Sequence, residues 1–403
     1  MIRHPKINLF LQNIALARKK VDFFLLVTIF AAINYASWTL SWLIYVDNLS
    51  QPKDWLLFWD TGNLIASGSF DKIYPGVTPK LPFIYPPYFL FLVYPLQYLS
   101  KPFGYIAIVA FSIMMLLLAF WVMSSIFKLN RLTFLKLCII ILSSASWIIM
   151  LPLGQFSSLY LFLICAGLYL RILKMSWQTG AVLSLLMVKP NIGIIFPFLF
   201  LLRREFKLLA GWLVGIGTLF LLSIFVFKNI WWDYISASTA INSIIAHIPP
   251  WKHHTLHAFL RSFINSNAQE FVFWSWVVAV FPLIGLCSYT WYSTKEYNDY
   301  YPRLFGIAIL AIIVCNPYLH HYDAIMAALP AVLWFSNKDQ YYFRFSYGLI
   351  GVFLFLAYLI QQVSVLYIQQ GLSLVSVPLI LWLIVDCFDL ISLNSTKPLT
   401  QDV

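Results

Sequence analysis

The stretch VLSLLMVKPNIGIIFPFLFLLRR, residues 182–204, places a lysine and a proline between two short apolar segments. As helices, the segments at 177–188 and 191–202 would each be roughly 20 Å long, whereas the hydrocarbon core of a bilayer is about 30 Å thick. The chain therefore turns at Lys189 before it has crossed a membrane. Non-helical backbone at that depth occurs only where it is buried in protein or lines a wet cavity. The stretch predicts a broken helix pair with Lys189 inside a cavity.

The rest of the chain has the composition of a membrane protein. Of its 403 residues, 61% are hydrophobic and 10% charged, and the mean hydropathy is +0.82. Soluble domains carry about 25% charged residues. Apolar runs long enough to cross a bilayer recur throughout, and they must be helical because lipid offers no partners to backbone polar groups. We expect an all-α polytopic membrane protein, a bundle of about 10–12 transmembrane or partly inserted helices with an outward-facing cavity. The whole of residues 1–403 would form one domain.

The positions of Lys and Arg predict the orientation of this bundle. Most of the 26 basic residues fall on one side if the N-terminal segment, with Arg18, Lys19 and Lys20, is cytoplasmic. Residues 46–103 and 228–270 then form long outer loops, and residues 391–403 form a cytoplasmic tail. No small-residue cleavage site follows the basic segment, so no cleaved signal peptide is predicted. The expected helices cover residues 22–45, 104–127, 137–153, 157–172, 177–188, 191–202, 208–227, 271–292, 304–315, 324–336, 346–363 and 372–390.

Several functional classes are disfavoured by the same composition. The net charge of +11 is spread over short segments between helices and forms no basic patch interleaved with aromatics, so no nucleic-acid partner is expected. No glycine-rich nucleotide-binding loop occurs. The five cysteines lie apart in apolar segments without CxxC spacing, which predicts neither a metal site nor a disulfide framework. We expect no cofactor and no metal. The cysteines are Cys138, Cys165, Cys287, Cys315 and Cys387.

The segment KDWLLFWD, residues 53–60, puts two carboxylates in the first outer loop. Asp54 and Asp60 are six residues apart, a spacing that does not place both on one helix face, so no carboxylate pair is predicted. One of them, preferably Asp54, would act as a general base whose pKa is raised by aromatic neighbours. The alternative is an interfacial helix with ordinary solvated carboxylates.

Lys189 is the sharpest candidate from the residues themselves. An ammonium between apolar half-helices is costly unless it faces a cavity or meets an anion, so an intramembrane lysine is a functional candidate. Pro190 would begin the next helix, whose first amides also favour an anion such as phosphate. The alternative is a lysine that reaches the outer headgroups.

Two histidine-bearing segments also fall on the outer side. In NPYLHHYD, residues 316–323, His320 and His321 would donate to a phosphate or position an acceptor hydroxyl, and Asp323 would orient one of them. A structural polar cap is the alternative. Adjacent histidines without a third ligand do not predict zinc.

The second histidine-bearing segment is WKHHTLHAFLRSF, residues 251–263. Its helical spacing pairs His254 with His257 and His257 with Arg261. An amphipathic interfacial helix explains this pattern as well as an arginine that binds a lipid-linked phosphate does. Tyr85 in FIYPPYF and Gln155 in GQFSS are weaker signals, because two prolines mark the start of a helix and a lone glutamine fits a turn.

Taken in order, these stretches resemble glycosyltransferase family 87. The resemblance rests on DWLLFWDTGN (54–63), FIYPP (83–87), LPLGQF (151–156), LLMVKPNIG (185–193), LLRR (201–204) and NPYLHHYD (316–323), within roughly residues 20–335. That family consists of polytopic GT-C type enzymes, including mannosyltransferases that use polyprenyl-phosphate mannose. This chain differs from the family in its His-His-Tyr-Asp sequence, where the family has a tryptophan before its histidine pair.

The resemblance implies a membrane glycosyltransferase of the GT-C type in a bacterial inner membrane. It would move a hexose, mannose-like, from a polyprenyl-phosphate sugar to a lipid or glycan acceptor on the extracytoplasmic face, with inversion. Asp54 matches the acidic residue proposed as base in that family. The implied donor-phosphate or substrate-binding residues are Lys189, Arg261, His320, His321, Tyr85 and Gln155. Membrane lipids would be the other partners.

Two alternative functions remain from the sequence. A lipid or solute transporter shares the intramembrane lysine and the broken helices, although no inverted repeat is evident and the polar residues gather on one face. A catalytically inactive protein that binds a polyprenyl lipid would carry the same cavity.

Overall fold

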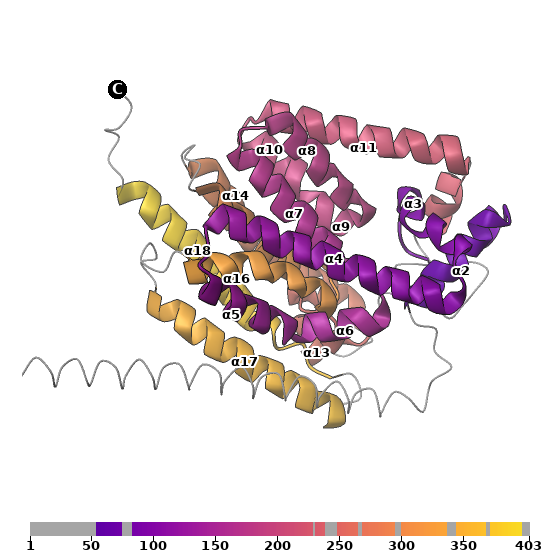
Figure 1. The fold of residues 1–403 in the computed structure, drawn as a ribbon. Helices are drawn as coiled ribbons and strands as arrows, with labels where there is room; N and C mark the ends of the chain where they lie inside the picture. The colour runs from indigo at the N-terminus through magenta and orange to yellow at the C-terminus, as the bar shows by residue number, and fades with distance from the viewer. Residues whose placement is uncertain are drawn as a thin grey trace, which may run out of the picture.

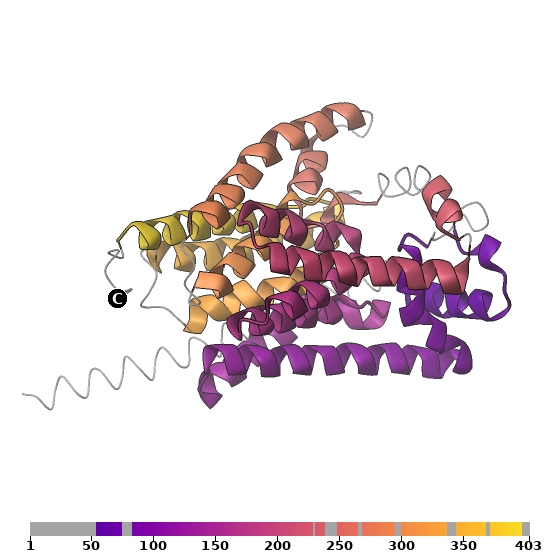
Figure 2. The same ribbon diagram turned by 90° about the horizontal axis from the view of Figure 1, so that it is seen from above.

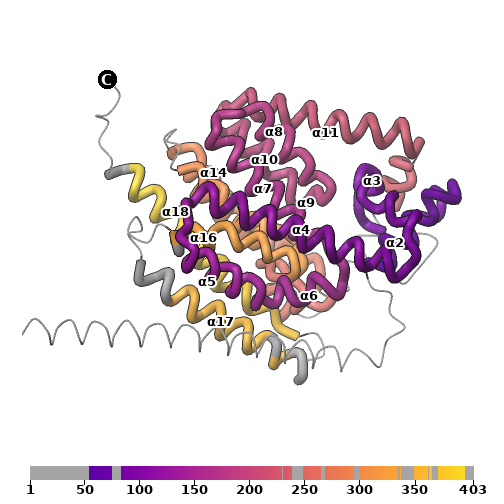
Figure 3. The backbone as a smooth tube through the Cα atoms, viewed as in Figure 1, coloured from indigo at the N-terminus to yellow at the C-terminus, as the bar shows by residue number. Residues whose placement is uncertain are grey.

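The computed structural model describes residues 54–74, 83–228, 230–237, 248–264, 268–294, 300–336, 344–367 and 371–396. Within these residues the secondary structure is entirely helical apart from one isolated β-bridge, as the ribbon and the Cα trace show (Figures 1 and 3). The expectation of an all-α fold is confirmed. The predicted first helix at 22–45 and the basic N-terminal segment lie outside the described residues.

The first described elements are short and gather at one end of α4 (Lys101–Phe127) (Figures 1 and 2). The ring of Phe227, at the end of α11 (Phe206–Phe227), contacts two rings of this group. A 3₁₀ turn starts at Pro87, because proline lacks an amide donor and fits best at the first helical position. The elements of this group are α2 (Asp54–Ala66), η1 (Phe70–Lys72), η2 (Pro87–Phe89), α3 (Leu90–Val93) and η3 (Tyr94–Tyr98).

One predicted helix, 137–153, is divided in the structure. α5 (Arg131–Leu142) and α6 (Ala145–Leu153) meet at an angle of 58°. The hydroxyl of Ser144 accepts a hydrogen bond from the amide of Trp147 and so starts a new helix inside the apolar run. The turn from α6 to α7 (Ser157–Ile172) needs glycine. Gly154 has φ +67°, and a Cβ there would lie 2.4 Å from the Cβ of Trp55 in α2.

The broken helix pair around Lys189 forms as predicted. α8 (Ser176–Ser184) and η4 (Leu185–Val188) lead to the turn, and α9 (Pro190–Gly193) and α10 (Ile195–Leu202) leave it. α8 packs closely on α11 through glycines. A Cβ on Gly180 would lie 2.0 Å from the carbonyl oxygen of Leu208, and one on Gly211 would lie 2.1 Å from that of Trp177. Small residues of this kind let membrane helices approach at backbone distance.

The C-terminal half supplies the centre of the bundle. Every residue of α15 from Tyr301 to Val314 is buried. α18 ends at Thr396, a few residues beyond the predicted end at 390, inside the expected tail. The elements of this half are η5 (Pro250–Lys252), α13 (Leu256–Phe263), α14 (Gln269–Ser293), α15 (Tyr301–Cys315), η7 (His321–Ala327), α16 (Ala328–Ser336), α17 (Arg344–Tyr367) and α18 (Ser376–Thr396).

Several described helices have the length and apolarity of membrane spans. They are α4, α11, α14 and α18, with the bent pair α5–α6 as a fifth. Six shorter apolar helices accompany them. Large apolar side chains such as Phe225 on α11 and Phe281 on α14 are 84% and 79% exposed, as expected for surfaces that face lipid. The chain is a polytopic integral membrane protein.

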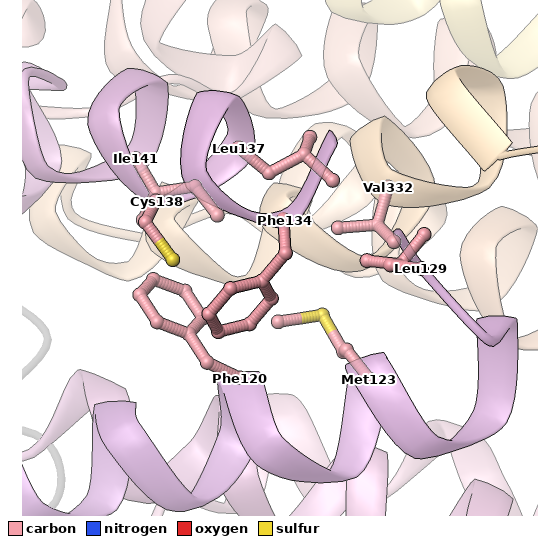
Figure 4. Close-up of a pocket in the computed structure, with 8 residues that line it drawn as sticks. All are labelled: Phe120, Met123, Leu129, Phe134, Leu137, Cys138, Ile141 and Val332. Carbon is pink, nitrogen blue, oxygen red and sulfur yellow. The ribbon is translucent and has the colours of Figure 1, made fainter. Parts of the chain in front are cut away.

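A hydrophobic pocket lies between α4, α5 and α16 (Figure 4). None of its lining residues carries a charge, a hydroxyl or an amide side chain. Such a lining offers no side-chain hydrogen-bond partner to a sugar or a phosphate. It is lined by Phe120, Met123, Leu129, Phe134, Leu137, Cys138, Ile141 and Val332.

Candidate active site

Asp54 begins α2, and its carboxylate is held by the α6–α7 turn. The side-chain nitrogen of Gln155 donates a hydrogen bond to Asp54 Oδ2. The amide oxygen of Gln155 accepts from the hydroxyl of Tyr85 at 3.3 Å, and its backbone carbonyl accepts from Ser112 at 2.9 Å. These contacts fix which side of the buried amide faces the carboxylate. Gln155 and Tyr85, which were expected to bind substrate, therefore form a series of hydrogen bonds that positions Asp54.

Tyr85 is placed by aromatic packing. Its ring stacks on that of Phe89 with centroids 4.0 Å apart and also contacts the ring of Phe58. The hydroxyl of Tyr74 donates to its carbonyl at 3.0 Å. The rings of Phe89 and Phe58 and the hydroxyl of Tyr74 therefore hold Tyr85 in the position from which its hydroxyl reaches Gln155 in the α6–α7 turn.

The surroundings of Asp54 favour a carboxyl group that can exchange a proton. Burial raises the pKa of Asp54 above its ordinary value. The hydrogen bond from Gln155 and the charges of Lys252 and Lys189 lower that pKa without cancelling the effect of burial. Asp60 is exposed on the same helix and has Lys101 nearby. The two aspartates thus occupy different environments, as their spacing predicts.

Lys189 lies in the η4–α9 turn and forms a buried ion pair with Asp323. Its Nζ is 2.5 Å from Asp323 Oδ2. Asp323 is fully buried and accepts a second hydrogen bond from Ser157 at 2.7 Å. The rings of Tyr160 and Tyr322 flank the ammonium at 5.6 and 5.4 Å. The charge of Lys189 also acts on the carboxylate of Asp54. Asp323 holds this lysine instead of orienting a histidine as the sequence suggested.

Lys252 is a second cation at the site, one that the sequence analysis did not single out. Burial lowers the pKa of Lys252, and the nearby Asp54 carboxylate raises it. Its ammonium lies 5.6 Å from the centroid of the Trp251 ring. The residue stands in the WKHH segment that was read for its histidines and arginine. No local signal separates it from other loop lysines, because its relation to Asp54 is created only by folding.

His320 and His321 both contact the ring of Tyr322 but differ in their other neighbours. The ring of His320 stacks on Tyr322 at 5.0 Å and on His253 at 4.6 Å. Nδ1 of His321 donates to the carbonyl of Lys252 at 2.8 Å. The two residues therefore connect η7 to the segment that carries Lys252.

Arg261 lies further along, on α13. Its guanidinium donates to the carbonyl of Ile248 at 3.1 Å, and its charge lowers the pKa of His257 and of His253. Helix α13 begins at Leu256, after the hydroxyl of Thr255 accepts from the amide of Ala258. The predicted i, i+4 relation of His257 and Arg261 thus lies on one helix, whereas His254 precedes it.

The site as a whole joins six segments distant in sequence: the start of α2, the segment before η2 that carries Tyr85, the α6–α7 turn, the η4–α9 turn, η5 and the start of η7. It combines one partly exposed carboxylate, two lysines, and a set of imidazole and phenol rings. This arrangement suits the removal of a proton near positive charges that attract an anion. In the described part of the chain, no group of three His, Cys, Asp or Glu side chains is arranged to hold a metal ion.

Comparison with known proteins agrees with these features. A sequence model of the family described as glycosyltransferase family 87 matches residues 83–317, which is more than half of the chain and includes Tyr85, Gln155, Lys189, Lys252 and Arg261. No curated protein and no solved structure matches the chain. The match, the helical bundle and the apolar spans together show that the chain belongs to glycosyltransferase family 87 and is a membrane glycosyltransferase.

Proposed function

We propose that this protein transfers a hexose, mannose-like, from a polyprenyl-phosphate sugar to a hydroxyl of a lipid or glycan acceptor, with inversion at the anomeric carbon. The observation that supports this most is that the positive charges of Lys252 and Lys189 both act on the carboxylate of Asp54. A base and two cations are what a single displacement with a phosphate leaving group requires. The site would face the extracytoplasmic side of a bacterial inner membrane.

Asp54 is a better base than Asp323. Asp323 is fully buried and is already engaged by Lys189 and Ser157. Asp54 is partly exposed, and Gln155 holds one oxygen of its carboxylate. Its raised pKa brings it closer to neutrality, where a carboxylate accepts a proton more readily.

The proposed step breaks one bond at the anomeric carbon and forms another. The acceptor oxygen attacks this carbon while its proton passes to the carboxylate of Asp54. The bond between the carbon and the phosphate oxygen breaks, and its electron pair leaves with polyprenyl phosphate. One carboxylate is sufficient for such an inverting displacement, whereas a retaining mechanism would need a second, nucleophilic one near the same carbon.

The donor phosphate is assigned to the cations of the site. Lys189 and Lys252 would stabilise the charge that develops on the leaving phosphate in a low-dielectric pocket. Arg261 lies beyond the histidines and would contact the far side of the phosphate or the start of the lipid. His320 would donate a hydrogen bond to the same phosphate. His321, whose Nδ1 proton is donated to the Lys252 carbonyl, would instead accept a hydrogen bond from an acceptor hydroxyl through Nε2. We expect the reaction to need no metal.

A matched pair of variants on α2 tests the base. Wild-type protein, Asp54→Asn and Asp60→Asn are reconstituted in lipid nanodiscs with radiolabelled polyprenyl-phosphate mannose and membrane glycolipids as acceptors. Because general-base catalysis contributes about 10²- to 10⁴-fold, Asp54→Asn should lose activity by that factor while Asp60→Asn keeps it. Turnover by Asp54→Asn at the wild-type rate would refute the assignment. Binding without turnover by the wild type would favour an inactive lipid-binding protein.

A further inference from the structure

Five histidines gather where η5 and the start of α13 meet η7. The ring of His253 stacks on that of His320 at 4.6 Å, and the ring of His254 lies 6.2 Å from that of His321. An antiparallel β-bridge joins the backbones of His253 and His320. The fifth member, His257, contacts Trp276 and Tyr318. The cluster adjoins Lys252 and therefore the site that contains Asp54.

The backbone beneath this cluster is held firmly. The carbonyls of residues 251, 252 and 253 accept hydrogen bonds from Gln361 at 2.9 Å, His321 at 2.8 Å and Ser373 at 2.7 Å. Three consecutive carbonyls thus accept hydrogen bonds from side chains of three other segments, namely α17, η7 and the residues before α18. The position of the two imidazoles that follow is set by this anchoring.

The imidazoles of His253 and His254 are buried without hydrogen-bond partners in the part of the chain that the structure describes. The two residues are 2% and 4% exposed, and neither ring nitrogen of either has a partner. Buried polar atoms in native proteins are almost always paired, because an unpaired one loses its water and gains nothing. A segment that is anchored at its backbone and leaves four ring nitrogens unpaired can take a partner that the described residues do not supply.

The chemistry of these rings points to hydroxyl groups. Burial, with the nearby His321, lowers the pKa of His254 to about 3, and burial also lowers that of His253, so both rings are neutral near pH 7. A neutral imidazole offers one N–H donor and one acceptor nitrogen. A hydroxyl both donates and accepts, whereas a fully ionised phosphate oxygen only accepts and would leave one nitrogen of each ring unpaired. Among the described residues no group suited to a metal ion occurs.

We propose that His253 and His254 form a subsite that binds hydroxyl groups of a hexose beside Lys252 and Asp54. The Trp251 ring, stacked on His321 at 5.9 Å, supplies the kind of aromatic wall that accompanies a few placed polar groups in small-molecule sites. The hexose belongs either to the donor or to a glycan acceptor. The inference rests on the proposed function, since it names the part of the substrate that this half of the site recognises.

The test replaces each ring by one of similar shape without nitrogen, in His253→Phe and His254→Phe. Both variants should unfold at or above the wild-type temperature, because unpaired polar atoms are removed. His257→Phe is the matched control. The ring of His257 forms a hydrogen bond with the backbone of Pro317, so the loss of this hydrogen bond in His257→Phe should lower the unfolding temperature.

Binding in nanodiscs then identifies the source of the hydroxyls without any need for turnover. If the donor sugar occupies the subsite, His254→Phe should bind polyprenyl-phosphate mannose about tenfold more weakly and bare polyprenyl phosphate equally well. If the acceptor occupies it, the loss should appear instead for methyl mannoside added with polyprenyl phosphate. Equal binding of all three probes by wild type and variants, or a lower unfolding temperature alone, would overturn the proposal. Failure of the proposed function is read separately, from the turnover of Asp54→Asn.

Discussion

The ion pair between Lys189 and Asp323 allows the sharpest test of what holds the site together. Lys189→Met keeps a side chain of similar length. It leaves the fully buried carboxylate of Asp323 with Ser157 as its remaining described hydrogen-bond donor. Removing one partner of a buried pair costs about 3–5 kcal/mol of unfolding free energy. Asp323→Asn should cost a similar amount, because it leaves the ammonium buried. The double variant contains neither charge, so the two losses should not add and the coupling energy should be about 2–3 kcal/mol.

The cycle is measured by unfolding in mixed micelles, followed by tryptophan fluorescence, with transfer activity assayed on the same samples. The double variant should recover much of the stability while its activity stays low, because in the proposed reaction Lys189 also stabilises the leaving phosphate. The buried pair of Arg303 and Asp389, which lies at other elements, serves as control. Its double variant should recover stability and also keep activity.

Two results would refute this reasoning. Free-energy losses that simply add would mean that Lys189 and Asp323 do not form a pair in the membrane. Wild-type activity in a stable double variant would mean that the charge of Lys189 has no part in the reaction.

Four further predictions follow from the geometry. Because burial raises the pKa of Asp54, the pH at which kcat/KM falls on the acid side should lie above the ordinary pKa of an aspartate. Gln155→Leu should move this pH higher still, because it removes a hydrogen bond that favours the charged carboxylate. A carboxyl group whose pKa is raised by folding stabilises the folded state at low pH, and this stabilisation is lost as pH rises. Asp54→Asn should therefore raise the unfolding midpoint at pH 7, and the difference between the midpoints of variant and wild type should shrink on acidification. Gly180→Ala should destabilise the fold by about 1–3 kcal/mol or more, because the added Cβ would lie 2.0 Å from the Leu208 carbonyl oxygen. A Cβ at Gly217 would have no neighbouring atom within 4 Å, so Gly217→Ala should leave the stability unchanged in the same micelle assay. Incubation with EDTA should leave the transfer rate unchanged, and restoration by a divalent cation after a loss would contradict the prediction.

Much of the secondary structure is predictable because membrane helices are long apolar runs bounded by charges and turns. Residues 157–172 were expected as a helix and form α7, and the expected helix at 208–227 begins two residues earlier as α11. The break at Ser144 was not expected. A serine cap is a local signal, and inside an apolar run it does not interrupt the hydrophobicity from which the helix was predicted.

Only some members of the candidate site are predictable from the sequence. Asp54 and Lys189 stand out in the sequence, since each is a charge that a membrane segment tolerates only with a compensating environment. Tyr85 and Gln155 were predicted as site residues from the family resemblance. In the structure their hydrogen bonds position Asp54. Lys252 has no sequence signal that distinguishes it.

The amino-acid sequence by itself thus determined that this chain is a helical membrane protein with a broken helix pair at Lys189. Only the tertiary structure decided which polar groups meet. Asp323 pairs with a lysine 134 residues away, and Gln155 reaches a carboxylate 101 residues away. Hydrophobic periodicity tells which side of a helix turns inward, but the partner of a buried charge depends on how several helices pack together. For the same reason the histidines that follow η5 and those at the start of η7, which are separate in the sequence, form one cluster next to Lys252.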